Sequence, residues 1–391
     1  MPPVSNRLSN LPPYVFSVIG DRLRQMREDG IDVYRLDIGN PDMPPPDTVI
    51  EQLAESASQP VHHGYTGYRG LASFRQAVSR YYHKRFGVTV DPDTQVLPLI
   101  GTKEGIVNLA LAYLDRGDVA LVPDIGYPSY AMGTRLAGGE VHWIPLRPNN
   151  GFLPDLDSIP DHIAAKARIL WVNYPNNPTG AVAGPETYQA LVAYCRQHDI
   201  LLASDNPYVD VTYDGYKAIS VLQADPELTT SLEFMSLSKT YNMAGWRLGA
   251  AVGSAAAIEA LLNIKSNIDS GHFQAIYDAG SKALDDVPQS WLESRNAVYA
   301  KRREHIMTAL PYIGLEAAMP RGTLYVWAKI KEGTEADYVE NALKQAHVSL
   351  APGSAYGPGG QGYVRISLAV PDDRLDAALE SLKSWYAVVA P

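Results

Sequence analysis

A lysine and an arginine stand among small and hydroxyl side chains in residues 236–249, which read SLSKTYNMAGWRLG. The segment follows LEFM at 232–235, whose apolar character is typical of a strand. A lysine amine at the end of a strand could act as a nucleophile or a base, but most lysines are solvated surface cations. Whether Lys239 does chemistry therefore depends on the residues that the fold brings beside it.

Polar residues of complementary types follow several other apolar segments. In open α/β sheets, ligands bind outside the carboxyl ends of the strands, so these residues are expected to share one edge. They are Gly101, Thr102 and Lys103, then Tyr127, Asn176 and Asn177, Asp205 with Tyr208, and Ser236 to Lys239. Together they supply an anion-binding turn, an aromatic ring, an amide, a carboxylate, a phenol and an amine.

These groups are the ones that a pyridoxal phosphate enzyme needs. A lysine amine can form an imine with the cofactor aldehyde and later carry a proton. A buried carboxylate keeps the pyridine nitrogen protonated, while an amide and a phenol can hydrogen-bond the ring hydroxyl. The phosphate requires N–H groups at a helix start, hydroxyls and a cation. The sequence therefore predicts pyridoxal 5'-phosphate as the cofactor.

The composition limits the other classes of function. The chain has 391 residues, 46% of them hydrophobic and 19% charged, which is sufficient for one large domain with a smaller companion. Its net charge of −10 argues against nucleic acid or an anionic membrane as the main partner. The histidines and the one cysteine show none of the usual metal-site spacings, so no metal site is expected.

Targeting signals are not apparent. No apolar segment approaches the roughly 18 to 20 residues that span a bilayer, and residues 1–16 lack the apolar middle of a signal peptide. The only cysteine, Cys195, cannot form an internal disulfide. We therefore expect a cytoplasmic protein.

Strand and helix patterns alternate from about residue 70 onward. Apolar, strand-like segments lie at 94–101, 117–128, 140–146, 167–175, 200–208 and 232–238. Apolar residues on both faces are typical of strands buried in a parallel sheet. This pattern predicts an α/β fold whose large domain contains a mostly parallel sheet of about seven strands with helices on both faces.

The C-terminal part has a different pattern. After a long helical stretch at 289–310, strands are predicted at 322–330 and 362–370 and helices at 336–346 and 373–386. These elements predict a smaller α+β domain. We expect residues 1–45 to form an N-terminal arm and part of the small domain, 46–285 the large cofactor-binding domain, and 286–391 the small domain.

Four motifs in order along the chain resemble the signatures of class I/II pyridoxal phosphate-dependent aminotransferases, the fold-type-I group. They are NNPTG at 176–180, DNPY at 205–208, SLSK at 236–239 and Arg247. The resemblance covers nearly the whole chain. It implies an enzyme that moves an amino group between an L-amino acid and a 2-oxo acid by a ping-pong mechanism.

The resemblance also implies roles for residues around the cofactor ring. Lys239 is expected to be the Schiff-base lysine, Asp205 the partner of the pyridine nitrogen, and Tyr208 a ligand of the ring hydroxyl; these three are the predicted catalytic residues. Asn177 is expected to bond the same ring hydroxyl and to take part in substrate binding. Tyr127 is expected to stack on the ring face.

Further residues are implied for the phosphate and the substrate. The expected phosphate ligands are Ser236, Ser238, Arg247, Thr102 and Lys103. Tyr65, in HGYTGYRG, matches a tyrosine that reaches the phosphate of the neighbouring subunit, which implies a homodimer with shared active sites. Arg365 matches the arginine that clamps the substrate α-carboxylate, a bidentate task suited to arginine. Gly39 would bring backbone close to that carboxylate, and Tyr14 would lie near the substrate.

The substrate is less well determined by motifs. LPPYVF at 11–16 and KSNIDSGHFQAI at 265–276 are similar to a subfamily with bacterial LL-diaminopimelate and glutamate–pyruvate aminotransferases. We expect LL-diaminopimelate with 2-oxoglutarate, with alanine or aspartate as alternative donors and a C–S β-lyase as a less favoured reaction. The loop 266–273 is expected to line the pocket with Asn267, Asp269 and His272. Asp269 could meet the distal ammonium of diaminopimelate or could equally be a solvated loop residue.

Overall fold

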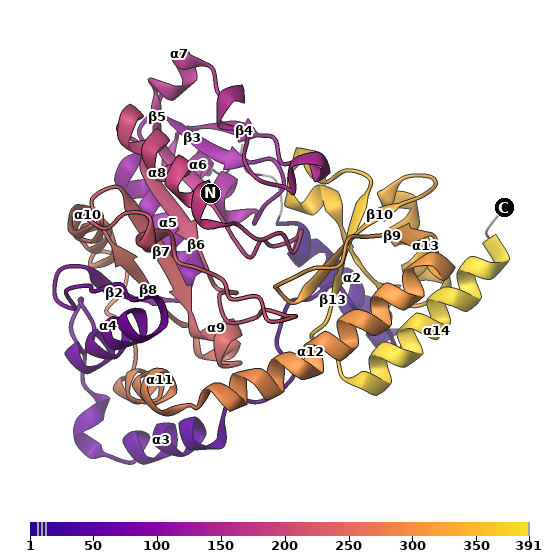
Figure 1. The fold of residues 1–391 in the computed structure, drawn as a ribbon. Coiled ribbons are helices and arrows are strands. Elements are labelled where there is room, and N and C mark those ends of the chain that lie inside the picture. Colours follow the sequence, from indigo (N-terminus) through magenta and orange to yellow (C-terminus); the bar gives the residue numbers. More distant parts are fainter. Residues whose placement is uncertain (6–7, 9–10, 12–13, 390–391) are drawn as a thin grey trace.

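The structure is a computed structural model that describes residues 1–5, 8, 11 and 14–389 (Figure 1). Pro12 and Pro13 of the LPPYVF segment lie outside the described residues. The chain forms a large sheet, a second smaller sheet, and helices around both. None of the helices in the described part combines the length and the apolar character needed to cross a membrane.

A seven-stranded sheet forms the centre of the larger part. Its strand order is β2 (Val96–Ile100), β8 (Leu248–Gly253), β7 (Ser231–Ser236), β6 (Leu201–Asp205), β5 (Ala167–Val172), β3 (Val119–Pro123) and β4 (Glu140–Ile144). Only β8 runs antiparallel to its neighbours, so the predicted mostly parallel sheet is confirmed. The sequence pattern does not single out β8, because its LGAAVG segment has small residues where a buried strand usually has branched ones.

Helices cover both faces of this sheet, as the near-continuous apolar strands require. In β5, Ile169 and Trp171 pack toward one face, while Leu170 and Val172 pack toward the other. The helices on the first face are α5 (Thr102–Tyr113), α6 (Ser129–Ala137) and α10 (Ala255–Lys265). Those on the second face include α4 (Ala72–Phe86), α8 (Pro185–His198) and α11 (Gln274–Asp286), with α3 (Asp47–Ala57) packed against α11.

The C-terminal part is built on an antiparallel sheet. Its order is β12 (Ala351–Pro352), β13 (Tyr363–Ser367), β10 (Tyr325–Ile330) and β9 (Leu315–Glu316), with α13 (Glu335–Gln345) and α14 (Asp372–Val389) beside it. The N-terminal β1 (Tyr34–Arg35), which follows α2 (Val15–Glu28), pairs with β11 (Val348–Ser349). This pairing supports assigning part of the arm to the small domain, and the domain bounds at 45 and 285 remain a proposal.

The long helix α12 (Gln289–Ala309) joins the two parts (Figure 1). Its buried Arg295 donates hydrogen bonds to the main-chain oxygens of Lys239, at 2.9 Å, and of Thr240, and to that of Asp210 at 2.5 Å. Lys239 and Thr240 end the short helix α9 (Leu237–Thr240), whose last carbonyls have no partner within the helix. Arg295 therefore fixes the backbone that carries Lys239.

We expect Arg295→Met to lower the free energy of unfolding by about 2 to 5 kcal/mol, because it removes the donor shared by three buried carbonyl groups. Urea unfolding followed by tryptophan fluorescence measures this change. The control is Arg24→Met, which removes an exposed ion pair with Asp21 and should cost at most about 1 kcal/mol. Equal losses of unfolding free energy in the two variants would show that Arg295 stabilises the protein no more than an exposed ion pair does.

Candidate active site

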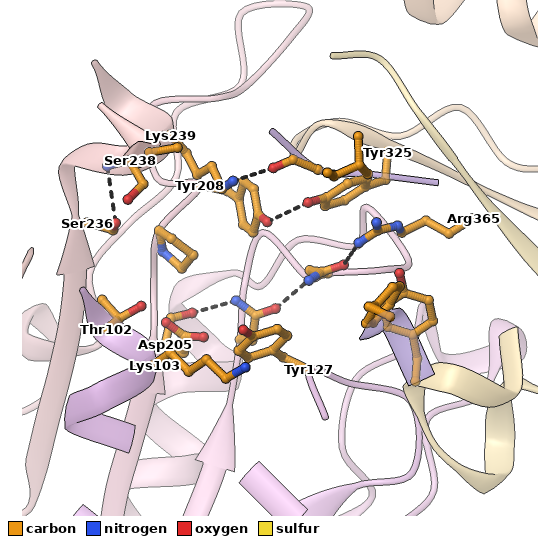
Figure 2. Close-up of a pocket in the computed structure, with 18 of the residues that line it drawn as sticks. Thr102, Lys103, Tyr127, Asp205, Tyr208, Ser236, Ser238, Lys239, Tyr325 and Arg365 are labelled. Atoms are coloured by element: carbon orange, nitrogen blue, oxygen red, sulfur yellow. Dashed lines mark hydrogen bonds between the residues drawn. The ribbon is translucent and has the colours of Figure 1, made fainter. Parts of the chain in front are cut away.

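A cavity of about 320 Å³ lies where the carboxyl ends of the large sheet meet the small sheet and the N-terminal segment (Figure 2). It is lined by most of the predicted site residues: Tyr14, Gly39, Thr102, Lys103, Tyr127, Asn177, Asp205, Tyr208, Ser236, Ser238, Lys239, Arg247 and Arg365. The antiparallel β8 explains how Arg247 joins them, because it precedes the first residue of a strand whose start lies at this edge. The structure thus brings these residues together, while their individual roles remain predictions.

Asp205 presents a buried carboxylate at the end of β6. Its Oδ2 accepts a hydrogen bond of 2.7 Å from the hydroxyl of Tyr130, and its main-chain oxygen accepts one of 2.5 Å from Asn173. Oδ1 has no hydrogen-bond partner among the described residues. Burial raises the pKa of the Asp205 carboxyl to about 7, and the Tyr130 hydrogen bond opposes this rise. An unsatisfied buried carboxylate oxygen fits a protonated ring nitrogen.

Lys239 extends into the cavity from the short helix α9. Its Nζ donates a hydrogen bond to the main-chain oxygen of Gly39, which comes from the N-terminal segment (Figure 2). Burial lowers the pKa of the Lys239 amine, and the nearby Arg365 and Arg247 lower it further, while Tyr325 opposes them. More of the amine is therefore neutral near pH 7, as a nucleophile or base requires.

An anion-binding cradle lies at one end of the cavity. Gly101, with φ of 74°, precedes α5, so the unpaired N–H groups of the first turn of that helix face this region. Ser236 accepts a hydrogen bond from the Ser238 N–H at 3.2 Å, and Arg247 donates one to the Ala244 carbonyl at 2.8 Å. A Cβ at Gly101 would lie 2.1 Å from Nη2 of Arg247. The absent side chain leaves room for the guanidinium beside the helix start.

Arg365 is held at the opposite side of the cavity by β13. Its Nη1 donates to the side-chain oxygen of Asn177 at 3.0 Å, and its Nη2 donates to the main-chain oxygen of Asp37 at 2.6 Å. The guanidinium carbon lies 3.8 Å from the centre of the Tyr325 ring. These contacts orient a buried, permanently charged group that can bind a carboxylate.

Several residues of the site were not predicted. Tyr130 and Asn173 support Asp205, and Tyr325 contacts Arg365, Tyr208 and Gly39. Asn173 directly follows the apolar end of β5, so the strand-end rule that found Asp205 could have found it. Tyr325 lies inside the apolar segment LYVWAKI, where nothing distinguishes a site residue from a core residue.

Tyr65 and the loop 266–273 do not line the cavity of their own chain. The Tyr65 side chain is almost fully exposed. Asp269 accepts hydrogen bonds from the buried amine of Lys265 at 2.6 and 2.7 Å, so it is neither a solvated loop residue nor an unpaired carboxylate awaiting a substrate ammonium. The other two loop candidates are likewise engaged: Asn267 donates to the Asn263 carbonyl, and His272 hydrogen-bonds the Arg247 carbonyl.

The residues present fit pyridoxal phosphate. The buried Asp205 oxygen suits the pyridine nitrogen, Lys239 suits the aldehyde, and the cradle around Gly101 and Arg247 suits a phosphate. Among the described residues, no group of three or more histidine, cysteine, aspartate or glutamate side chains could hold a metal ion.

Comparisons with known proteins agree with this chemistry. A family model described as aminotransferase class I and II matches residues 31–382. The chain is 45% identical to an LL-diaminopimelate aminotransferase of Dehalococcoides mccartyi over 98% of both chains, and 47% identical to one of Moorella thermoacetica over 97% of both. Among solved structures, it resembles apo-BacF of Bacillus subtilis, with a TM-score of 0.94, 34% identity and 98% coverage of both chains. It also resembles the aspartate aminotransferase of Thermus thermophilus with maleate, with a TM-score of 0.91, 29% identity and coverage of 98% and 100%.

We expect Gly101→Ala to weaken pyridoxal phosphate binding by about tenfold or more, equivalent to about 1.4 kcal/mol, because the added Cβ would strike Arg247. Fluorescence titration of the cofactor-free protein measures the dissociation constant. Gly117→Ala is the matched control, since Gly117 also has a positive φ, of 97°, but no atom lies within 4 Å of its added Cβ. If both variants lost a similar amount of cofactor affinity, backbone strain alone would explain the effect, and contact with Arg247 would not be needed.

The raised pKa of Asp205 predicts a pH-dependent stability of the cofactor-free protein. Between about pH 4 and pH 7 the unfolded chain has lost a proton that folded Asp205 retains, so stability falls as the pH rises and levels off above 7. Asp205→Asn stays neutral and can still accept the Tyr130 hydrogen bond. Urea unfolding should find the variant more stable by about 1.5 kcal/mol at pH 5 and about 4 kcal/mol at pH 8. A difference that did not grow with pH would contradict the raised pKa.

Proposed function

The chain belongs to the class I and II aminotransferases, and on this premise we propose that it moves an amino group from LL-diaminopimelate to 2-oxoglutarate. It is a pyridoxal phosphate-dependent enzyme with the fold of that family. The single observation that carries the proposed reaction is the convergence of Lys239, Asp205 and Arg365 on one cavity. The proposed donor is supported by the relatives of that name, at 42 to 47% identity over nearly the whole chain.

The residues of this chain would divide the work as follows. Arg365 binds the α-carboxylate of the substrate and thereby directs its Cα toward Lys239. The bound cofactor supplies an electron sink for the charge that develops at Cα. Asp205 would stabilise positive charge at the ring nitrogen. Lys239 would take the proton from the substrate Cα and deliver it to C4′ of the cofactor. Burial lowers the pKa of the Lys239 amine, which suits Lys239 to this transfer.

The cofactor is further held by groups that do not exchange protons with the substrate. In the proposal, Tyr208 and Asn177 hydrogen-bond the ring hydroxyl, and Tyr127 packs against the ring. Thr102, Lys103, Ser236, Ser238 and Arg247 hold the phosphate, as their position around the start of α5 allows.

The cavity offers a positive charge to a substrate with a distal carboxylate. Arg35 and Asp37 form an ion pair with two contacts of 2.7 and 2.8 Å, and both residues line the cavity. The Asp37 carboxylate is buried and already paired, whereas the Arg35 side chain is 32% exposed. The distal carboxylate of diaminopimelate or of 2-oxoglutarate can therefore meet Arg35, and alanine has no such group.

We also propose a cytoplasmic homodimer. The exposed Tyr65 would reach the phosphate site of the neighbouring subunit, which agrees with its position outside the cavity of its own chain. Thr66, next to Tyr65, donates a hydrogen bond of 3.0 Å to the main-chain oxygen of His272, so the neighbouring copy of the loop 266–273 would lie near the same site.

We expect the purified enzyme to form glutamate from LL-diaminopimelate and 2-oxoglutarate with a kcat/KM at least about tenfold above that with alanine or aspartate, since one well-placed ion pair is worth about 1.4 kcal/mol or more. Lys239→Ala should lower turnover by at least about 10² to 10⁴-fold, while Lys166→Ala, which changes an exposed lysine, should not. Coupled detection of glutamate measures both.

Two results would contradict the proposal. Glutamate formed from alanine but not from LL-diaminopimelate would exclude the donor. Pyruvate and ammonia formed from a cysteine conjugate without any 2-oxo acid, and in the absence of aminotransfer, would indicate a lyase.

A further inference from the structure

Tyr325 occupies a central position in the site that no motif indicated. It begins β10 in the small sheet and is buried, and its side chain lines the cavity between the two sheets (Figure 2). There it contacts one residue from each of three other segments: Tyr208 after β6, Gly39 in the N-terminal segment, and Arg365 on β13. A core tyrosine without a role in the site would need none of these contacts.

The hydroxyl of Tyr325 lies 2.9 Å from the hydroxyl of Tyr208, and the two rings meet edge to face. Burial, followed by the neighbouring Tyr325, raises the pKa of Tyr208 well above its usual value. Burial alone would also raise the pKa of Tyr325, but Arg365, Lys239 and the hydrogen bond with Tyr208 hold it below its usual value. Either hydroxyl can donate in this bond. A phenol has one proton, so once Tyr208 donates its proton to the ring hydroxyl of the cofactor, as proposed, Tyr325 must be the donor between the two phenols.

Gly39 provides the space for this hydroxyl. A Cβ on Gly39 would lie 1.8 Å from the Tyr325 hydroxyl oxygen, so that oxygen fills the place of a side chain at position 39. The main-chain oxygen of the same glycine accepts the hydrogen bond of Lys239. Tyr325 and Lys239 therefore both contact Gly39.

The ring of Tyr325 has a second contact. Arg365 lies over it, with the guanidinium carbon 3.8 Å from the ring centre, a geometry in which the ring face attracts the cation. The ring limits the movement of Arg365, while Asn177 and Asp37 accept its hydrogen bonds.

From these contacts we propose that Tyr325 is a positioning residue for aminotransfer: its hydroxyl donates to Tyr208, so that the Tyr208 hydroxyl is aimed at the cofactor ring, and its ring supports Arg365. This inference rests on the proposed function. Hydrogen bonds in a chain strengthen one another, so the donation from Tyr325 makes Tyr208 a stronger donor to the ring hydroxyl. The residue joins the cofactor side and the substrate side of the site.

Two substitutions separate the two contacts. Tyr325→Phe removes only the hydroxyl, and Tyr325→Leu also removes the ring face. For Tyr325→Phe we expect the pH midpoint of the absorbance change of the bound cofactor to rise by about 0.5 to 1, kcat to fall by about three- to tenfold, and KM for the amino acid to change by less than about threefold. Tyr325→Leu should additionally raise that KM by about tenfold, since Arg365 loses its support.

A double substitution tests whether Tyr325 acts through Tyr208. Tyr208→Phe alone should raise the pH midpoint, and adding Tyr325→Phe should then move it no further. The control is Tyr338→Phe, which removes another buried hydroxyl of the small sheet region, one that donates to the Ile313 carbonyl at 2.6 Å, away from the cavity. It should leave midpoint, kcat and KM unchanged.

The outcomes distinguish this inference from the proposed function. The pH midpoint is read without any substrate, so failure of LL-diaminopimelate as donor would leave this measurement intact. An unchanged midpoint in Tyr325→Phe, in an enzyme that binds the cofactor normally, would overturn the proposed action on Tyr208. Additive shifts in the double variant would overturn it as well, and an unchanged KM in Tyr325→Leu would overturn the support of Arg365.

Discussion

The buried carboxylate of Asp205 imposes the main energetic constraint on this structure. Removing a carboxylate from water costs several kcal/mol unless a partner compensates it, and here only one oxygen has a hydrogen bond from the described residues. Neighbouring side chains hold Asp205 in place and offset part of this cost. Tyr130 donates to one oxygen while its ring stacks on Trp171 at 5.0 Å, and Asn173 fixes the main chain. In the proposed function, the remaining oxygen binds the protonated ring nitrogen of the cofactor.

The second constraint is that the site must assemble across separate parts of the fold. Asp205 ends a strand of the large sheet and Lys239 lies in the helix α9 that follows β7, while Arg365 and Tyr325 belong to the small sheet and Gly39 to the N-terminal segment. Hydrogen bonds between main-chain and side-chain groups connect them, notably from Arg365 to Asp37 and Asn177. Arg295 on α12 adds a further connection, because it donates a hydrogen bond to the main-chain oxygen of Lys239. The two Arg365 bonds are buried, so the small sheet, the large domain and the N-terminal segment are joined at the site itself.

Much of the arrangement could be predicted from the sequence because polar residues directly follow apolar strands. Asp205 and Lys239 stand where β6 and β7 end, so the rule for open α/β sheets places them at one edge without tertiary knowledge. Tyr325 could not be found in this way, since it lies within an apolar strand and acts through contacts from three distant segments. The sequence did not predict the contact between Asp37 and Arg365, because Asp37 accepts the hydrogen bond with its main-chain oxygen, a group that every residue type has. Asp269 was considered as a free charge because the buried amine of Lys265, one helical turn earlier, looks in the sequence like any surface lysine.

The reversed direction of β8 has a consequence for how such sites can be modified. Since β7 ends and β8 begins at the same edge, the residues proposed to hold the aldehyde and part of the phosphate, from Ser236 through Lys239 to Arg247, lie on one short continuous stretch of chain. Contacts this local in sequence form early and need little chain closure. The stretch 236–253 is therefore a natural unit for exchange between relatives. A chimaera carrying it would transfer the lysine and part of the phosphate cradle together, while the cavity walls contributed by the N-terminal segment and the small sheet stay with the recipient.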